Sequence, residues 1–178
     1  HLSEARPTTI NKLEADSFIG LSSILNVNAC ETVSSSTELY CLELTDKLIL
    51  DLYKSEESFS NWCDSKVQIA DSYQVAIKIK NELVKSQFSI KELTDKLLNN
   101  INIITVKSND KISYNKDFIR IIGSGNIIDK SIGESVDEET IFITRGPLPA
   151  RLYELNQEFY KEIAKNNVVN YEENDSKN

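Results

Sequence analysis

The chain has 178 residues, of which 40% are hydrophobic and 27% charged, a balance typical of globular proteins and not of intrinsically disordered ones. Its five glycines and three prolines are too few for the many tight turns of an all-β sandwich. The net charge of −8 disfavours binding of the whole chain to nucleic acid or anionic membranes, and no apolar run is long enough to span a bilayer.

The N-terminal half has the hydrophobic periodicity of amphipathic helices. We predict helices over about residues 9–25, 37–52 and 56–84, separated by short polar breaks. The second helix has the most regular apolar stripe, with residues three and four positions apart: Cys41, Leu44, Leu48 and Leu52. Neither glycine nor proline occurs between residues 34 and 115, which favours long uninterrupted helices.

A capping box marks the start of a shorter helix. Ser89 is followed three residues later by Glu92, so the serine side chain is expected to accept from the backbone of the first turn while the glutamate bonds back to the cap. The predicted helix covers Ile90 to about Asn99 and completes an amphipathic helical bundle over about residues 9–99.

The pattern then changes to that of β-strands. Residues 101–106 are rich in β-branched side chains, and residues 112–122 alternate across a second strand candidate after a turn at 108–111. These two segments predict a β-hairpin, and residues 139–144 a third short strand. Pro149 suits the first turn of a closing helix over about 149–165, whose apolar stripe comprises Leu148, Leu152, Leu155, Phe159 and Ile163.

The predicted fold class is therefore α+β, mainly α, with a helical bundle, a small antiparallel sheet over about 101–144 and a C-terminal helix. One domain over residues 1–178 is the favoured organisation. The alternative is a helical part at 9–86 and an α+β part at 87–167. The polar residues 168–178 are predicted to form a disordered tail.

Most catalytic arrangements are disfavoured by counting residue types. The only histidine is His1, so a serine or cysteine nucleophile lacks an imidazole base. There is no Cys-x-x-Cys pair and no P-loop, and Gly123-Ser124-Gly125 is best interpreted as a turn. We therefore expect no enzyme activity, no cofactor, no metal and no small-molecule substrate.

The three cysteines, Cys30, Cys41 and Cys63, are odd in number and widely spaced. We interpret them as reduced and buried, which favours an intracellular protein of the nucleus or cytoplasm. A secreted factor with one disulfide and one free thiol is the alternative.

One segment departs from the acidic composition. From Lys78 to Arg120 the chain has nine basic and five acidic residues, a local charge of +4, whereas the rest carries −12. The order of elements at 76–122, helix, short capped helix and hairpin, resembles a winged-helix unit. That resemblance implies nucleic-acid binding, with Lys91 and Lys96 facing the groove and the remaining basic side chains meeting phosphates: Lys107, Lys111, Lys116 and Arg120.

The favoured hypothesis is a non-catalytic protein–protein interaction subunit of a multiprotein assembly. Wide apolar helical faces and the lack of catalytic residue types motivate it. The expected partners are other protein subunits, with nucleic acid as the alternative and no membrane.

Overall fold

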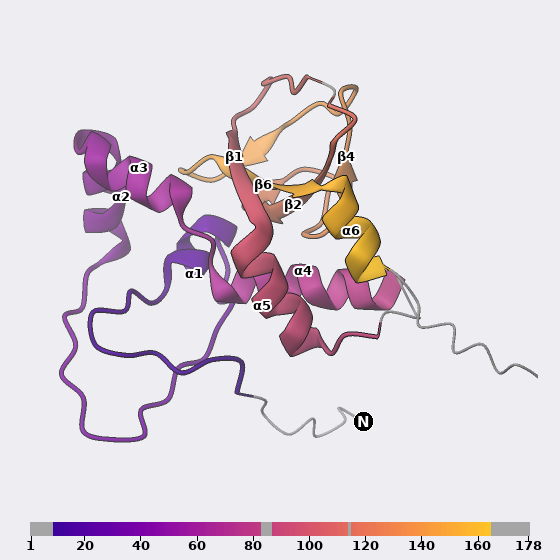
Figure 1. Ribbon diagram of the computed structural model, residues 1–178. Coiled ribbons are helices and arrows are strands. Elements are labelled where there is room, and N and C mark those ends of the chain that lie inside the picture. Colours follow the sequence, from indigo (N-terminus) through magenta and orange to yellow (C-terminus); the bar gives the residue numbers. More distant parts are fainter. Residues whose placement is uncertain (1–8, 83–86, 114, 165–178) are drawn as a thin grey trace, which may run out of the picture.

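The computed structural model describes residues 9–82, 87–113 and 115–164 (Figure 1). Its centre is an antiparallel sheet with strand order β1-β6-β2-β4, formed by Ile101–Val106, Ala150–Asn156, Phe118–Ser124 and Ser135–Val136. A second pair joins β3 (Asn126–Ile127) to β5 (Thr144–Arg145). Strand β6 lies between β1 and β2, and nearly all of it is buried.

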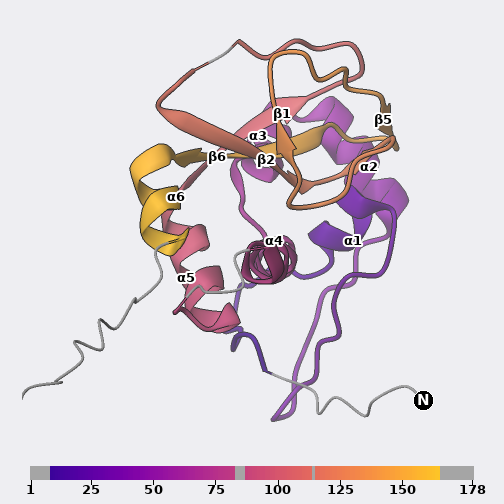
Figure 2. The same ribbon diagram turned by 90° about the vertical axis from the view of Figure 1, so that its right-hand side faces the viewer.

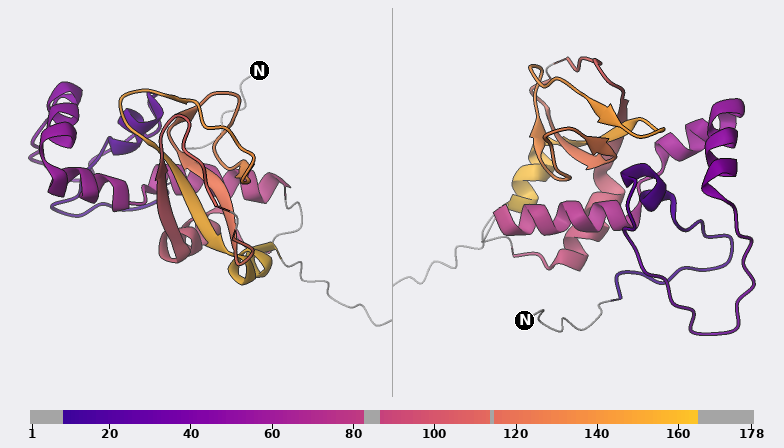
Figure 3. Two further views of the ribbon diagram at one scale, coloured as in Figure 1. Left: turned by 90° about the horizontal axis from the view of Figure 1, so that it is seen from above. Right: turned by 180° about the vertical axis from the view of Figure 1, so that it is seen from behind.

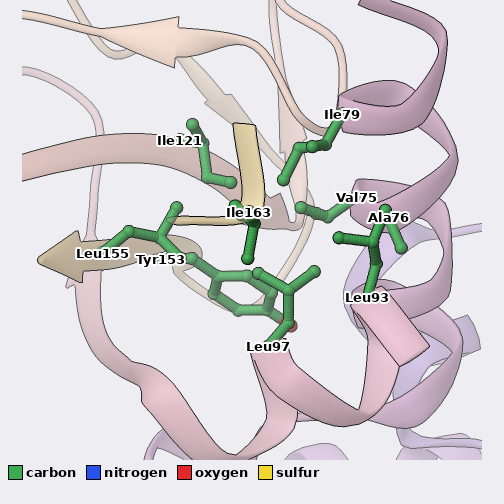
Figure 4. Close-up of a cluster of buried hydrophobic side chains, with 9 residues drawn as sticks. All are labelled: Val75, Ala76, Ile79, Leu93, Leu97, Ile121, Tyr153, Leu155 and Ile163. Atoms are coloured by element: carbon green, nitrogen blue, oxygen red, sulfur yellow. The ribbon is translucent and has the colours of Figure 1, made fainter. Parts of the chain in front are cut away.

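Helices α4 (Ile69–Glu82), α5 (Ile90–Asn100) and α6 (Gln157–Ala164) lie on one side of the sheet (Figures 1 and 2). Alternate residues of the strands point to this side, because side chains alternate across a strand. The resulting core surrounds the Tyr153 ring (Figure 4) and comprises Val75, Ala76, Ile79, Leu93, Leu97, Ile121, Tyr153, Leu155 and Ile163.

The other side of the sheet is covered by the segment that contains β3 and β5. Phe142 from this segment is fully buried. It belongs to a second core formed by Val106, Ile122, Ile127, Phe142, Ala150 and Leu152. The sheet is thus buried on both faces.

Helices α1 (Leu21–Asn26), α2 (Asp46–Ser55) and α3 (Glu57–Ser65) form a separate group at one end of the sheet (Figure 3). Their core comprises Leu21, Leu25, Cys63 and Leu148. Trp62 packs beside it, 5.4 Å from Phe18 and 5.9 Å from Phe59 between ring centroids. Trp62 is therefore a packing residue of this group.

The fold class is confirmed as α+β, mainly α. The short helix begins at Ile90 as predicted, with both bonds of the capping box formed: the Ser89 hydroxyl accepts from the Glu92 amide at 3.2 Å, and Glu92 accepts from the Ser89 amide at 2.7 Å. The first strand also has its predicted bounds, 101–106.

We expect Ser89→Ala to lower the free energy of unfolding by about 1 kcal/mol, because it removes the cap acceptor of a helix that packs on the core. Chemical denaturation measures the loss. Ser89→Asp, which restores an acceptor at the cap, should recover most of it; an equal loss in both variants would contradict this role of the cap.

The N-terminal helix predictions were wrong in their extent. Residues 9–20 are not helical, so only Leu21–Asn26 remains of the first helix, preceded by Gly20 at φ +93°. The second helix begins at Asp46 and not at Thr37, capped by the Thr45 hydroxyl. The third is broken at residues 66–68 into α3 and α4. Its predicted last residues, 83 and 84, lie outside the described residues.

The C-terminal half also differs from the prediction. β1 and β2 do not form a hairpin, since both pair with β6. The second strand begins at Phe118 and not at 112, and of the predicted strand 139–144 only residue 144 lies in a strand, as the first residue of β5. The predicted closing helix at 149–165 is instead strand β6 followed by helix α6.

The winged-helix resemblance is not confirmed. Its wing would be a hairpin of β1 and β2, but β6 lies between these two strands and pairs with both. The alternative domain boundary near residue 86 and the predicted tail at 168–178 lie outside the described residues, so the domain organisation stays a prediction. Among the described helices, none is long and apolar enough to cross a membrane.

Candidate interaction surface

Two of the six predicted nucleic-acid contacts are paired with acids. The Lys96 ammonium lies 2.8 Å from the Glu162 carboxylate and over the Phe88 ring. Arg120 donates from Nε and Nη2 to one oxygen of Glu154 at 3.0 and 2.9 Å, and also bonds the Ser113 carbonyl. Their charges are therefore partly neutralised within the chain.

The other four basic residues are exposed but do not gather on one surface. β1 and β2 run in the same direction, since both pair antiparallel with β6, and Ile101 and Ile119 lie opposite the same residue, Leu155. The intervening segment must therefore return along the sheet, which puts Lys107 and Lys111 after the end of β1 and Lys116 before the start of β2. Lys91 lies at the far end of α5 from β1. The structure thus spreads the predicted contacts over the length of the sheet.

A different feature stands out: residues 27–45, the 27–45 loop, join α1 to α2 and extend away from the sheet (Figures 1 and 3). Every residue from 31 to 48 is exposed. The loop has three glutamates and no basic residue. Ordinary connections have about 4–6 residues, and loops longer than about 15 are usually functional or disordered.

Large apolar side chains are exposed at the end of this loop and the start of α2. Tyr40 is 91% and Leu42 86% exposed, although such residues are usually at least partly buried. They belong to a group that we call the 39–48 surface: Leu39, Tyr40, Leu42, Leu44 and Leu48.

The first end of the loop is held by Asn26, the last residue of α1. Its side-chain amide donates to Asp71 of α4 at 2.9 Å and to the Ser22 carbonyl at 2.9 Å. Its oxygen accepts from the Gly125 amide, 99 residues later in the chain, at 2.7 Å. One short side chain therefore ties α1 to α4 and to the end of β2.

The second end is held through Arg151 of β6, whose side chain is 1% exposed. Its Nη2 donates to the Cys63 carbonyl at 2.8 Å and to Asp64 at 3.2 Å. Asp64 in turn accepts from the Tyr53 hydroxyl at 2.9 and 2.8 Å. This chain of contacts fixes α2 and α3 on the sheet, so the 27–45 loop runs between two anchored ends.

A buried polar centre lies between these anchors. Asp71 is 1% exposed, and burial raises the pKa of its carboxyl to about 6, against the lowering effects of Asn26 and the Arg151 charge. Burial likewise raises the pKa of the Tyr153 hydroxyl, with the Asp71 charge adding to the rise. Several buried polar atoms make no hydrogen bond within the described part of the protein, including Asp71 Oδ2, Arg151 Nε and Nη1, and Tyr153 Oη.

Comparisons with protein families, with curated proteins and with solved structures gave no match. The described residues bring together no group of three or more histidine, cysteine, aspartate or glutamate side chains suited to a metal. The cysteines are free: Cys63 is buried, Cys30 is half-buried and Cys41 is exposed on the 27–45 loop. The interpretation of all three as buried is therefore confirmed for Cys63 alone and is wrong for Cys41.

Two of the anchoring residues, Asp71 and Arg151, could be partly recognised from the sequence. Asp71 lies four and eight positions before Val75 and Ile79, so an acid occupies the apolar stripe of α4. Arg151 interrupts a run of apolar residues in the same way. A charged residue within a buried pattern needs polar partners, and in this protein those partners come from distant segments.

Proposed function

We propose that the protein is a non-catalytic interaction subunit that docks a partner protein through the 39–48 surface. The observation that supports this proposal is the exposure of Tyr40, Leu42 and their apolar neighbours on one continuous stretch of chain. Groups of exposed large apolar side chains are characteristic of protein-binding sites. We also propose an intracellular location, where the free cysteines would stay reduced.

The two anchors support the same proposal. Binding residues are commonly placed on loops that a rigid scaffold positions. Asn26 and Arg151 hold the elements at either end of the loop on the sheet. Because the ends are fixed, a partner has to order only the loop itself, which reduces the entropy lost on binding.

The proposal predicts that Leu42→Glu/Leu44→Glu strongly weakens partner capture. Burying two carboxylates in an apolar contact should cost at least about 2 kcal/mol, or roughly 30-fold in affinity. The measurement is a tagged pull-down of the full chain from native lysate, with nuclease, read by quantitative mass spectrometry.

Ile141→Glu/Ile143→Glu is the matched control, because these side chains are also two positions apart and 74% and 48% exposed. The control variant should retain the stoichiometric partners of the wild type. Equal recovery by the Leu42/Leu44 variant would contradict the proposal, and partners that disappear with nuclease would favour nucleic-acid binding.

A further inference from the structure

A cavity lies where three segments that are distant in sequence meet. Its volume is about 180 Å³, and its walls come from residues 26–30, from α4 and from residues 125–132. Cavities of about 150 Å³ are large enough to accept a benzene ring. The space is therefore sufficient for a molecule with one small ring and a short substituent.

Hydrogen-bonding groups without a partner gather in this cavity. Three side-chain amides and one lysine line it: Asn28, Gln74, Asn126 and Lys130. In the part of the chain that the structure describes, none of these four side chains makes a hydrogen bond or an ion pair. Each amide offers donors beside an acceptor, and two isoleucines add an apolar wall: Ile127 and Ile132.

The charges around the cavity favour an uncharged ligand. Lys130 is the only charged side chain among the described residues that line it. Acids adjoin the lining, since Asp129 precedes Lys130 and Glu31 follows Cys30. Burial and the charges of nearby acids raise the pKa of the Cys30 thiol, so it is protonated at neutral pH. The positive and negative charges therefore offset each other, and the uncharged amides dominate recognition.

The backbone at the cavity is held in unusual conformations. Val27 has φ +51° and Asp129 has φ +61°, a region that a β-branched residue such as valine rarely adopts. Asn26, beside Val27, accepts from the Gly125 amide at 2.7 Å and so joins two walls of the cavity. Such strained residues cluster at ligand sites. Walls that are fixed before binding also reduce the entropy lost when a ligand enters.

We propose that this cavity binds a small, planar, uncharged molecule with an amide edge, as in a primary carboxamide or a nucleobase. Such an edge places a donor beside an acceptor, and asparagine or glutamine pairs with it through two hydrogen bonds. Gln74 and Asn126 are half-buried and would make these contacts. The ring would lie against Ile127 and Ile132. The inference does not rest on the proposed docking function, because the cavity includes no residue of the 39–48 surface.

The test is an NMR titration of the full ¹⁵N-labelled chain with nicotinamide and, separately, with uracil. The side-chain amide signals of Gln74 and Asn126 should shift and saturate with a Kd of about 1 mM or tighter for at least one probe. The tighter probe distinguishes a carboxamide from a nucleobase. Nicotinate, which has a carboxylate in place of the amide, should bind at least tenfold more weakly because it lacks the donor. No saturable shift with either uncharged probe, or equal binding of nicotinate, would overturn the inference.

A variant of α4 tests the assigned contact. Gln74→Ala should weaken binding of the tighter probe at least tenfold, since it removes a paired hydrogen-bonding group while alanine keeps the helix. Asn102→Ala removes an exposed amide from β1 and is the matched control, with an expected change of less than twofold. Equal affinity of both variants would contradict the assignment of Gln74 to the site.

Cysteine alkylation gives a readout that needs no variant. Cys30 lines the cavity, whereas Cys41 is exposed on the 27–45 loop. With the tighter probe at saturation, alkylation of Cys30 by iodoacetamide should slow at least fivefold while that of Cys41 stays unchanged, because only Cys30 is covered. Unchanged rates at both cysteines, or equal slowing of both, would place the probe elsewhere and overturn the inference.

Discussion

Replacing Gly123 by alanine is expected to destabilise the protein by about 3 kcal/mol or more, because the added methyl has no room. A Cβ at this position would lie 2.6 Å from Cγ of Tyr153 and closer still to two other ring carbons. The ring cannot move aside, since it is fully buried among Leu93, Leu97 and Ile163 (Figure 4). Chemical denaturation with urea measures the loss of unfolding free energy.

Gly20→Ala is the matched control for backbone conformation. Gly20 has φ +93°, but nothing lies within 4 Å of a Cβ built there, so this variant should lose only about 1 kcal/mol through strain. Tyr153→Leu should reduce the effect of Gly123→Ala when the two are combined, as expected for side chains in contact. Equal losses at Gly20 and Gly123 would contradict the packing of Tyr153 on β2.

Asp71→Asn is expected to stabilise the protein at pH 8, although it removes a charge near Arg151. The pKa of Asp71 rises from 3.8 to about 6 on folding. The protonated carboxyl therefore contributes its full stabilisation below pH 3.8. This contribution is lost as the pH rises from 3.8 through 6, because the unfolded chain then ionises more readily than the folded protein. A pKa shift of this size corresponds to roughly 3 kcal/mol. The free energy of unfolding of Asp71→Asn should therefore exceed that of the wild type by about 2–3 kcal/mol at pH 8 and by little near pH 4.

Asparagine also keeps the contact that the anchor needs, because its oxygen can accept from the Asn26 amide as the carboxylate does. Unfolding free energies of both proteins across pH 4–8 test the prediction. Asp95→Asn on the exposed surface of α5 should change stability by less than about 0.5 kcal/mol at any pH. A loss of stability in Asp71→Asn at pH 8 would show that the ionised carboxyl stabilises the fold.

Local signals predicted elements whose stabilising contacts are close in sequence. Ser89 and Glu92 bond each other's backbone, so the start of α5 was visible in four residues. The β-branched run at 101–106 likewise predicted β1. The start of α5 needs no distant partner, whereas β1 forms only by pairing with β6 and its local composition merely marked where it lies.

The apolar periodicity of the sequence predicted longer N-terminal helices than the structure contains. Residues 9–20 and 37–45 have apolar residues at helical spacing, but nearly all of them are exposed or only partly buried, and a short helix without a packed face is unstable in water.

Strand β6 could not be recognised because it is buried on both faces. Its residues do not alternate between polar and apolar: Leu152 faces one core, while Tyr153 and Leu155 face the other. The spacing of Leu148, Leu152 and Leu155 imitates a helix. Because β6 was predicted to be helical, the strand that lies between β1 and β2 was missing from the predicted sheet. The prediction therefore paired β1 and β2 with each other.

The candidate surface was only partly predictable. An interaction subunit was the favoured hypothesis, and wide helical faces motivated it. Of the predicted apolar stripe of the second helix, Leu44 and Leu48 belong to the 39–48 surface, but Leu44 lies in the 27–45 loop and not in a helix. Its anchors join residues as far apart as Asn26 and Gly125, a distance in sequence over which local patterns carry no information.

Hydrogen exchange of the 27–45 loop tests the central claim most directly, with the full chain compared alone and in complex with the partner lost from Leu42→Glu/Leu44→Glu. The amides of residues 37–45 should exchange fast in the free protein, slow at least tenfold in the complex, and do so without a comparable change in β1, β2 and β6. Unchanged exchange at 37–45, with protection gained elsewhere, would contradict the assignment of this segment as the docking surface.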